Sequence, residues 1–150
     1  MAASNIRGEI LKKSSFLTAE TLDVLNGGHF STYHSGVSVE ELRRRKKNIA
    51  SSFNSMADIN VALELAFSDA INAVAIEKAL KRAAEGDREE VPFFADYNLG
   101  YALVKSAKGE KVLPCSCGYF VIKLIDEDYR NKMTGMPFEV ITCILEPEEE

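Results

Sequence analysis

The 150-residue chain is poor in the residues that build disulfide and metal scaffolds, with only three cysteines and two histidines. An odd number of cysteines (Cys115, Cys117 and Cys143) does not suggest a disulfide framework. No apolar run approaches the roughly 20 residues of a transmembrane helix, and the first residues lack the apolar segment of a signal peptide, so secretory export is not expected. The length fits one globular domain that needs neither disulfide nor metal.

Motifs for common cofactors are also missing. There is no glycine-rich phosphate loop, and Gly27–Gly28 signals only a turn or a helix end. Cys115 and Cys117 stand too close together for a structural zinc pair, and no second pair accompanies them. We therefore expect no metal and no cofactor. A metal or thiol site at these two cysteines is the weakest alternative.

The net charge of −5 argues mildly against a nucleic-acid partner. Removing the four acids of the C-terminal LEPEEE leaves −5 + 4 = −1. The basic run RRRKK at 43–47 could form a local site for an anionic ligand or simply a solvated helix face, and the two interpretations are about equally favoured.

Helix signals dominate the first 90 residues. The stretch 10–16 is weakly helical, 18–28 has a cap at Thr18, and Ser38 with Glu41 forms a capping box that starts a helix near Val39. One long helix is predicted from Ser55 to Gly86. Its apolar stripe consists of Ile59, Leu63, Ala66, Phe67, Ala70 and Val74.

Strand signals follow after residue 90. The stretches 91–106, 117–127 and 136–145 are rich in β-branched and aromatic residues and predict three or four strands. Helices followed by strands indicate an α+β domain with an antiparallel sheet.

Both histidines lie in the segment GGHFSTYHSG, residues 27–36, which has no clear helix or strand pattern. Imidazole can move a proton near neutral pH, and the arginines of the following helix can bind phosphate. A pair of ordinary loop histidines is the simpler interpretation. Next to a basic helix, however, they supply the parts for phosphodiester chemistry without a metal.

The order of GGHFSTYHSGVSVEELRRR, ASSF, a long helix and TGMPFEVITCILEP resembles the ribonuclease A-like toxin domain found at the C-terminus of bacterial contact-dependent growth-inhibition and other polymorphic toxins. The resemblance runs from about Ala19 to Pro147. It implies a disulfide-free ribonuclease A-like fold in residues 19–150. Residues 1–18 would be a separate N-terminal segment, a linker or delivery region.

The resemblance also implies the site. Its histidine corresponds to His34, its arginine eleven residues later to Arg45, and its C-terminal threonine to Thr142. Ile144 stands where the family has a tyrosine, and an isoleucine cannot donate a proton or a hydrogen bond. His29 matches the family's first histidine and is a supporting candidate.

The implied activity is that of a metal-independent endoribonuclease that uses the ribose 2′-OH to cleave RNA, with tRNA among the candidate substrates. The domain would be delivered as part of a larger bacterial toxin and act as a monomer in the target-cell cytoplasm. A cognate immunity protein would be its partner, with no membrane contact by the mature domain. The alternative is a weakened or inactive ribonuclease A-like binding domain, which Ile144 favours.

Overall fold

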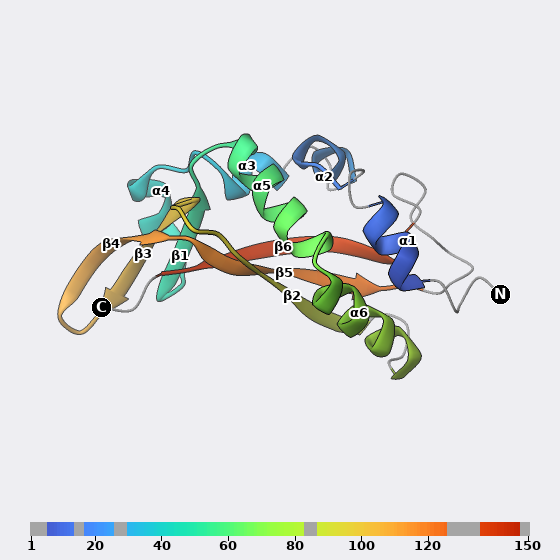
Figure 1. The fold of residues 1–150 in the computed structure, drawn as a ribbon. Helices are drawn as coiled ribbons and strands as arrows, with labels where there is room; N and C mark the ends of the chain where they lie inside the picture. Colours follow the sequence, from blue (N-terminus) through green and yellow to red (C-terminus); the bar gives the residue numbers. More distant parts are fainter. Residues whose placement is uncertain (1–5, 14–16, 26–29, 83–86, 126–135, 148–150) are drawn as a thin grey trace.

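The computed structural model describes residues 6–13, 17–25, 30–82, 87–125 and 136–147, and it confirms an α+β protein in which helices precede antiparallel strands. The helices lie mostly over one face of a long sheet, and a β-hairpin projects at the end of the molecule away from the first helix (Figure 1). Cys115, Cys117 and Cys143 form no disulfide with one another. The fold class predicted from the sequence is therefore correct.

Six helices lie among the described residues between positions 6 and 82. They are α1 (Ile6–Lys13), α2 (Ala19–Leu25), α3 (Phe30–His34), α4 (Val39–Arg44), α5 (Met56–Phe67) and α6 (Ala70–Arg82). The predicted caps are confirmed: the Ser38 hydroxyl accepts the Glu41 N–H at 3.1 Å, and the Thr18 hydroxyl accepts the Thr21 N–H at 3.2 Å.

The single long helix predicted over 55–86 is wrong, because the chain breaks between α5 and α6 and bends by 69°. The Ser68 hydroxyl bonds the Glu64 carbonyl, and Asp69 accepts the Ile71 N–H. Such side-chain bonds compete with the helical ladder. The predicted stripe therefore stops at Phe67. In α6 the buried apolar residues are Ala73, Ile76 and Ala79.

Six strands form two three-stranded antiparallel sheets, where the sequence predicted three or four strands in one. The first sheet has the order β1 (Ile49–Phe53), β3 (Gly100–Ser106), β4 (Gly109–Cys115). The second has the order β2 (Arg88–Phe94), β5 (Cys117–Leu124), β6 (Phe138–Glu146). The sheets meet where the Leu145 N–H of β6 donates to the Ser51 hydroxyl of β1 at 3.2 Å.

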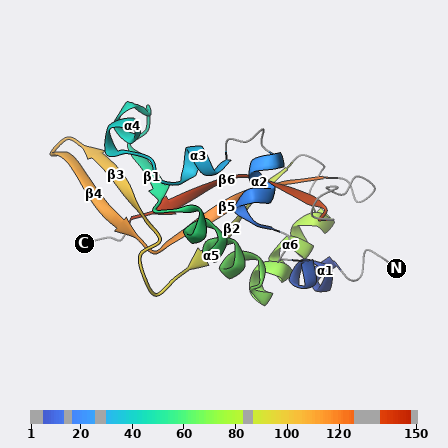
Figure 2. The same ribbon diagram turned by 90° about the horizontal axis from the view of Figure 1, so that it is seen from above.

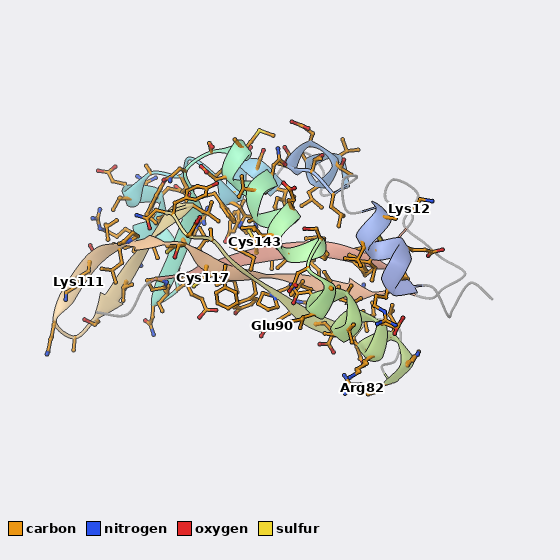
Figure 3. The ribbon with its side chains drawn as sticks, in the orientation of Figure 1. Lys12, Arg82, Glu90, Lys111, Cys117 and Cys143 are labelled. Atoms are coloured by element: carbon orange, nitrogen blue, oxygen red, sulfur yellow. The ribbon has the colours of Figure 1, made fainter. Side chains whose placement is uncertain are left out.

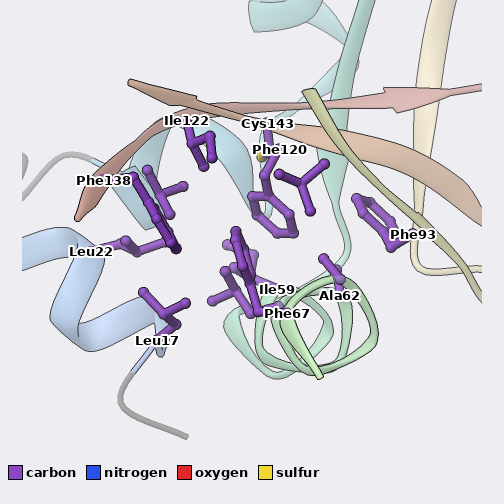
Figure 4. Close-up of a cluster of buried hydrophobic side chains, with 14 of the residues drawn as sticks. Leu17, Leu22, Ile59, Ala62, Phe67, Phe93, Phe120, Ile122, Phe138 and Cys143 are labelled. Atoms are coloured by element: carbon purple, nitrogen blue, oxygen red, sulfur yellow. The ribbon is translucent and has the colours of Figure 1, made fainter. Parts of the chain in front are cut away.

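A chain of aromatic rings ties the helices to both sheets (Figure 4). Phe67 of α5 lies 5.5 Å from Phe138 and 5.8 Å from Phe120, measured between ring centroids. Phe120 contacts Phe93 at 5.3 Å, and Phe93 contacts Phe53 of the first sheet at 6.1 Å. All five rings are buried, so this cluster fixes the relative position of the two sheets.

Residues on both sides of position 18 contribute to this core. Helix α1 packs against α6, and Ile10 is fully buried. In the part of the chain that the structure describes, no single helix is long and apolar enough to cross a bilayer; α5 and α6 reach that length only as a bent pair. The division into segments 1–18 and 19–150 stays a prediction.

Candidate functional site

The histidine segment folds as a short helix, α3, where the sequence showed no regular pattern. The Asp23 carboxylate of α2 accepts both the backbone N–H and the hydroxyl of Ser31, at 2.5 and 2.6 Å. An anion that accepts donors in the first turn stabilises a helix start. This contact fixes α3 and the His34 at its end. His29 lies outside the described residues.

The chain leaves α3 through a turn at Gly36, which is hydrogen-bonded to the end of β1. Gly36 has φ +62°, a left-handed conformation that glycine adopts at little cost, and its N–H donates to the Phe53 carbonyl at 2.8 Å. The buried Ser52 hydroxyl accepts the Val37 N–H at 3.1 Å. Viewed from above, α3 lies beside β1 and β6, where the two sheets meet (Figure 2).

The His34 ring is held on three sides. It packs 4.7 Å from the Phe30 ring and 4.8 Å from the Tyr33 ring, the latter edge-on. Its Nε2 lies 3.1 Å from the hydroxyl oxygen of Thr142, which is 108 residues away in sequence. The side chain is only 8% exposed. The imidazole has little contact with water, and its hydrogen bond to Thr142 orients the ring.

Burial, together with the positive charges of Arg45 and Lys47, lowers the pKa of His34 from 6.5 to about 4, and burial is the largest cause. The imidazole is therefore neutral at physiological pH. A neutral imidazole can accept a proton without first losing one, so the environment suits a general base.

Arg45 follows α4 and reaches back to the histidine helix. One Nη2–H donates to the Tyr33 carbonyl at 2.8 Å, and the guanidinium lies 3.7 Å from the centroid of the Tyr33 ring. Lys105 of β3 donates to the Arg45 carbonyl at 3.0 Å and holds the end of α4. Arg45 thus contributes positive charge beside His34 through contacts with the residue that precedes it.

The three consecutive arginines diverge, as predicted, but Arg45 is the extended C-cap residue of α4 and not a helical residue. Arg43 pairs with Glu110 at 2.8 Å, and Arg44 lies 3.5 Å from Glu41. Both of these pairs are largely exposed. Of the three, Arg45 is the one directed toward α3.

Thr142 owes its position to an irregularity in β6. The register between β5 and β6 shifts so that Val121 pairs with Thr142 but Ile122 pairs with Val140, which leaves Ile141 as an extra residue. A bulge of this kind reverses the alternation of a strand. Val140 is accordingly buried before it and Cys143 after it, while Thr142 is half-exposed and free to meet His34.

Ile144 lies on the same side of β6, directly opposite Tyr119 of β5. It is 36% exposed and borders an open cavity of about 770 Å³ where the two sheets meet. Burial and the neighbouring carboxylates of Glu90 and Glu146 raise the pKa of Tyr119, which keeps it a phenol. The cavity begins two residues along β6 from Thr142, and its lining includes neither His34 nor Arg45.

Metal-binding residues do not gather near these side chains. Over residues 6–13, 17–25, 30–82, 87–125 and 136–147, no three His, Cys, Asp or Glu residues form a group that could hold an ion. Cys115 and Cys143 are buried, and burial raises the pKa of Cys143. A thiolate at Cys143 is therefore disfavoured.

The structure brings His34 and Thr142 into direct contact and places Arg45 next to them. The sequence analysis missed Tyr33, the residue that links Arg45 to α3, and Asp23, which anchors the helix. Tyr33 precedes the histidine directly, and an aromatic near a basic run is a recognisable cation–π signal. Asp23 has no comparable signal, because its partner Ser31 is eight residues away in another helix.

Fold and site together define an α+β protein with two antiparallel sheets and a buried, neutral histidine at their junction. The sequence matches no protein-family model, and no curated protein matches it. A chain of the crystal structure of a CdiA-CT/CdiI complex from Y. kristensenii 33638 is similar in fold, with a TM-score of 0.62 and 19% identity. The similarity covers 80% of the present chain and 100% of that chain.

Proposed function

We propose that this protein is a metal-independent endoribonuclease toxin with His34, Arg45 and Thr142 in its active site. The observation that carries the proposal is the 3.1 Å contact between His34 Nε2 and the Thr142 hydroxyl. These two residues are far apart in sequence, and both were selected by the resemblance to ribonuclease A-like toxins. A ribonuclease A-like fold is part of the same proposal.

In this mechanism neutral His34 takes the proton of a ribose 2′-OH, and the 2′-oxygen attacks the adjacent phosphorus. The bond from phosphorus to the 5′-oxygen breaks, and that oxygen takes a proton from a second donor, for which His29 is the candidate. The products are a 2′,3′-cyclic phosphate and a free 5′-hydroxyl. DNA lacks the attacking hydroxyl and would not be cut.

Arg45 would stabilise the charge that develops on the phosphoryl oxygens. A guanidinium has five N–H donors, so the bond to the Tyr33 carbonyl leaves others for phosphate. Thr142 would hold the histidine ring in place and offer its hydroxyl to the phosphate or to a base. Lys47, which lies 5.9 Å from the centroid of the Tyr33 ring, adds further positive charge.

Delivery and control are proposed from the fold. The similar structure is a complex named for a CdiA-CT and a CdiI component. We infer that the present domain also belongs to a contact-dependent growth-inhibition toxin, carried by a larger bacterial protein and acting in the cytoplasm of a target cell. A cognate immunity protein would neutralise it, and RNA, including tRNA, would be its substrate.

The second candidate function is RNA or protein binding without cleavage. Ile144 favours it, because the family's tyrosine position here carries an apolar side chain that is 36% exposed. The negative net charge of −5 points the same way.

The deciding experiment is digestion of total RNA and tRNA in EDTA by the wild type and by His34→Gln. The His29→Gln variant is assayed beside them to test the candidate second proton donor. Glutamine is close to histidine in size, so the fold should survive, and circular dichroism checks this. Its side-chain amide is no base, so it cannot accept the proton. The proposal expects a loss of cleavage of at least 100-fold for His34→Gln. Products should carry 2′,3′-cyclic phosphates, and a 2′-deoxy substrate should be resistant.

Cleavage that requires a divalent metal, or that survives His34→Gln, would contradict the ribonuclease mechanism. A comparable loss in His29→Gln would identify His29 as the second proton carrier. RNA binding without cleavage would select the second candidate. In that case Ile144→Tyr is the variant to test for restored activity.

A further inference from the structure

An open cavity lies beside Thr142, where the two sheets meet. Large apolar side chains from different strands line it: Ile49 from β1, Val104 from β3, Leu113 from β4 and Ile144 from β6. Ile49 is 47% exposed and Ile144 is 36% exposed. The volume of about 770 Å³ lies within the range of small-ligand sites. Apolar groups around such a space favour a flat or apolar ligand group.

The polar part of the lining is also specific. Lys108 and Lys111 lie on the β3–β4 hairpin, which projects from the body of the molecule, and Lys111 is labelled there in Figure 3. Tyr119 adds an aromatic ring, and Glu146 adds a carboxylate. An exposed lysine favours a phosphate at the rim. A carboxylate in the wall disfavours phosphate there but can accept the N–H groups of a nucleobase.

The cavity is connected to the candidate site through β6. Thr142 and Ile144 lie on the same side of that strand, about 7 Å apart along it. This separation is within reach of one nucleotide. A strand whose phosphate lies at His34 and Thr142 can therefore place its neighbouring base in the cavity.

We propose that this cavity binds one unpaired nucleobase of an RNA strand, held against Ile144 and Tyr119. One phosphate that flanks this nucleotide would lie at His34 and Thr142, and the other at Lys108 and Lys111. The inference rests on the proposed function for its ligand class, but its test measures binding rather than cleavage. Bases that present N–H donors on their edge, such as cytosine, adenine and guanine, would be favoured by Glu146. Uracil offers the carboxylate fewer donors.

The test is equilibrium binding of a fluorescent, 2′-O-methyl single-stranded oligonucleotide, which the proposed chemistry cannot cut. Binding is compared with that of the same oligonucleotide made abasic. Ile144→Ser should weaken binding of the intact strand about tenfold, because it removes an apolar contact with the base, and should leave the abasic strand unaffected. Lys111→Gln should weaken both strands and flatten the salt dependence.

Two substitutions serve as matched controls. Val112→Ser changes a residue next to Lys111 that is 50% exposed and does not line the cavity. Lys123→Gln removes an exposed lysine of β5 that also lies outside the lining. Both should bind the intact strand like the wild type.

Equal affinity of the wild type for intact and abasic strands would overturn the proposal. Unchanged binding in Ile144→Ser would also overturn it, and the cavity would then be a candidate site for a segment of a protein partner. If the protein binds the intact strand through the cavity but does not cleave RNA, the proposed catalysis fails and the base site stands.

Discussion

Lowering the pH should destabilise the protein through His34, because the ring is neutral in the folded state and charged in the unfolded one. Its pKa is lowered from 6.5 to about 4, mainly by burial. Between these two values the unfolded chain binds more protons than the folded protein. The free energy of unfolding therefore decreases as the pH falls from about 7, and the contribution of His34 to this decrease levels off only below about pH 3.

The magnitude follows from the two pKa values. The free energy of unfolding should fall by about 2 kcal/mol between pH 7 and pH 5, and by about 3 kcal/mol by pH 4. The loss is a large part of the total stability of a typical domain. Urea unfolding at several pH values, with His34→Gln as reference, isolates it because His29 and the carboxylates are common to both proteins.

Ring signals in NMR spectra give the same quantity directly, since the chain has only two histidines and His29→Gln assigns them. We expect a His34 midpoint near 4. Cleavage should agree: about nine-tenths of the enzyme would still hold a neutral base at pH 5, so kcat/KM should persist well below pH 6. A midpoint at or above 6.5, or identical pH dependence in wild type and His34→Gln, would refute the argument that burial keeps this imidazole neutral.

Three further substitutions test the site and its frame. Thr142→Val keeps the shape of the side chain but removes the bond to His34, so RNA cleavage should fall about tenfold while urea unfolding changes by about 1 kcal/mol; unchanged activity would remove Thr142 from the mechanism. In Arg45→Lys the ammonium cannot both donate to the Tyr33 carbonyl and lie flat over the Tyr33 ring as the guanidinium does. Cleavage should therefore drop at least tenfold with little loss of stability. Wild-type rates would mean that the positive charge alone suffices. Gly118→Ala places a methyl group 2.1 Å from a carbonyl oxygen of β6, which should cost more than about 2 kcal/mol in urea unfolding, and a normal midpoint would contradict that close approach.

The sequence predicted those parts of the fold that depend on local signals. Ser38 and Ser55 cap helices where their hydroxyls were expected, because a cap needs only a few neighbouring residues. The strand β4 was missed for the opposite reason. Six of its seven residues are exposed or partly exposed, so it carries no apolar alternation and owes its place to pairing with β3.

The break at Ser68–Asp69 shows a different difficulty. Apolar spacing continues through it, and only the buried set changes, from Ile59, Leu63 and Phe67 in α5 to Ile76 in α6. Ser and Asp favour helix ends and turns, but they also occur within helices, so these two residues alone do not predict a break. The helix ends here because the bend lets both α5 and α6 pack against β2, and this packing cannot be seen in the local sequence.

The candidate site divides in the same way between local and long-range causes. His34 and Arg45 are eleven residues apart in sequence, so a motif could select both. No local pattern predicts that Thr142 faces the histidine: strict alternation in β6 would bury Thr142 with Val140, and only the extra residue Ile141 turns it out. Deleting Ile141 should therefore turn Thr142 toward the core and remove its contact with His34. The contact between His34 and Thr142 therefore depends on the register of β6 against β5. That register is determined by the pairing of the whole sheet and not by the residues next to Thr142.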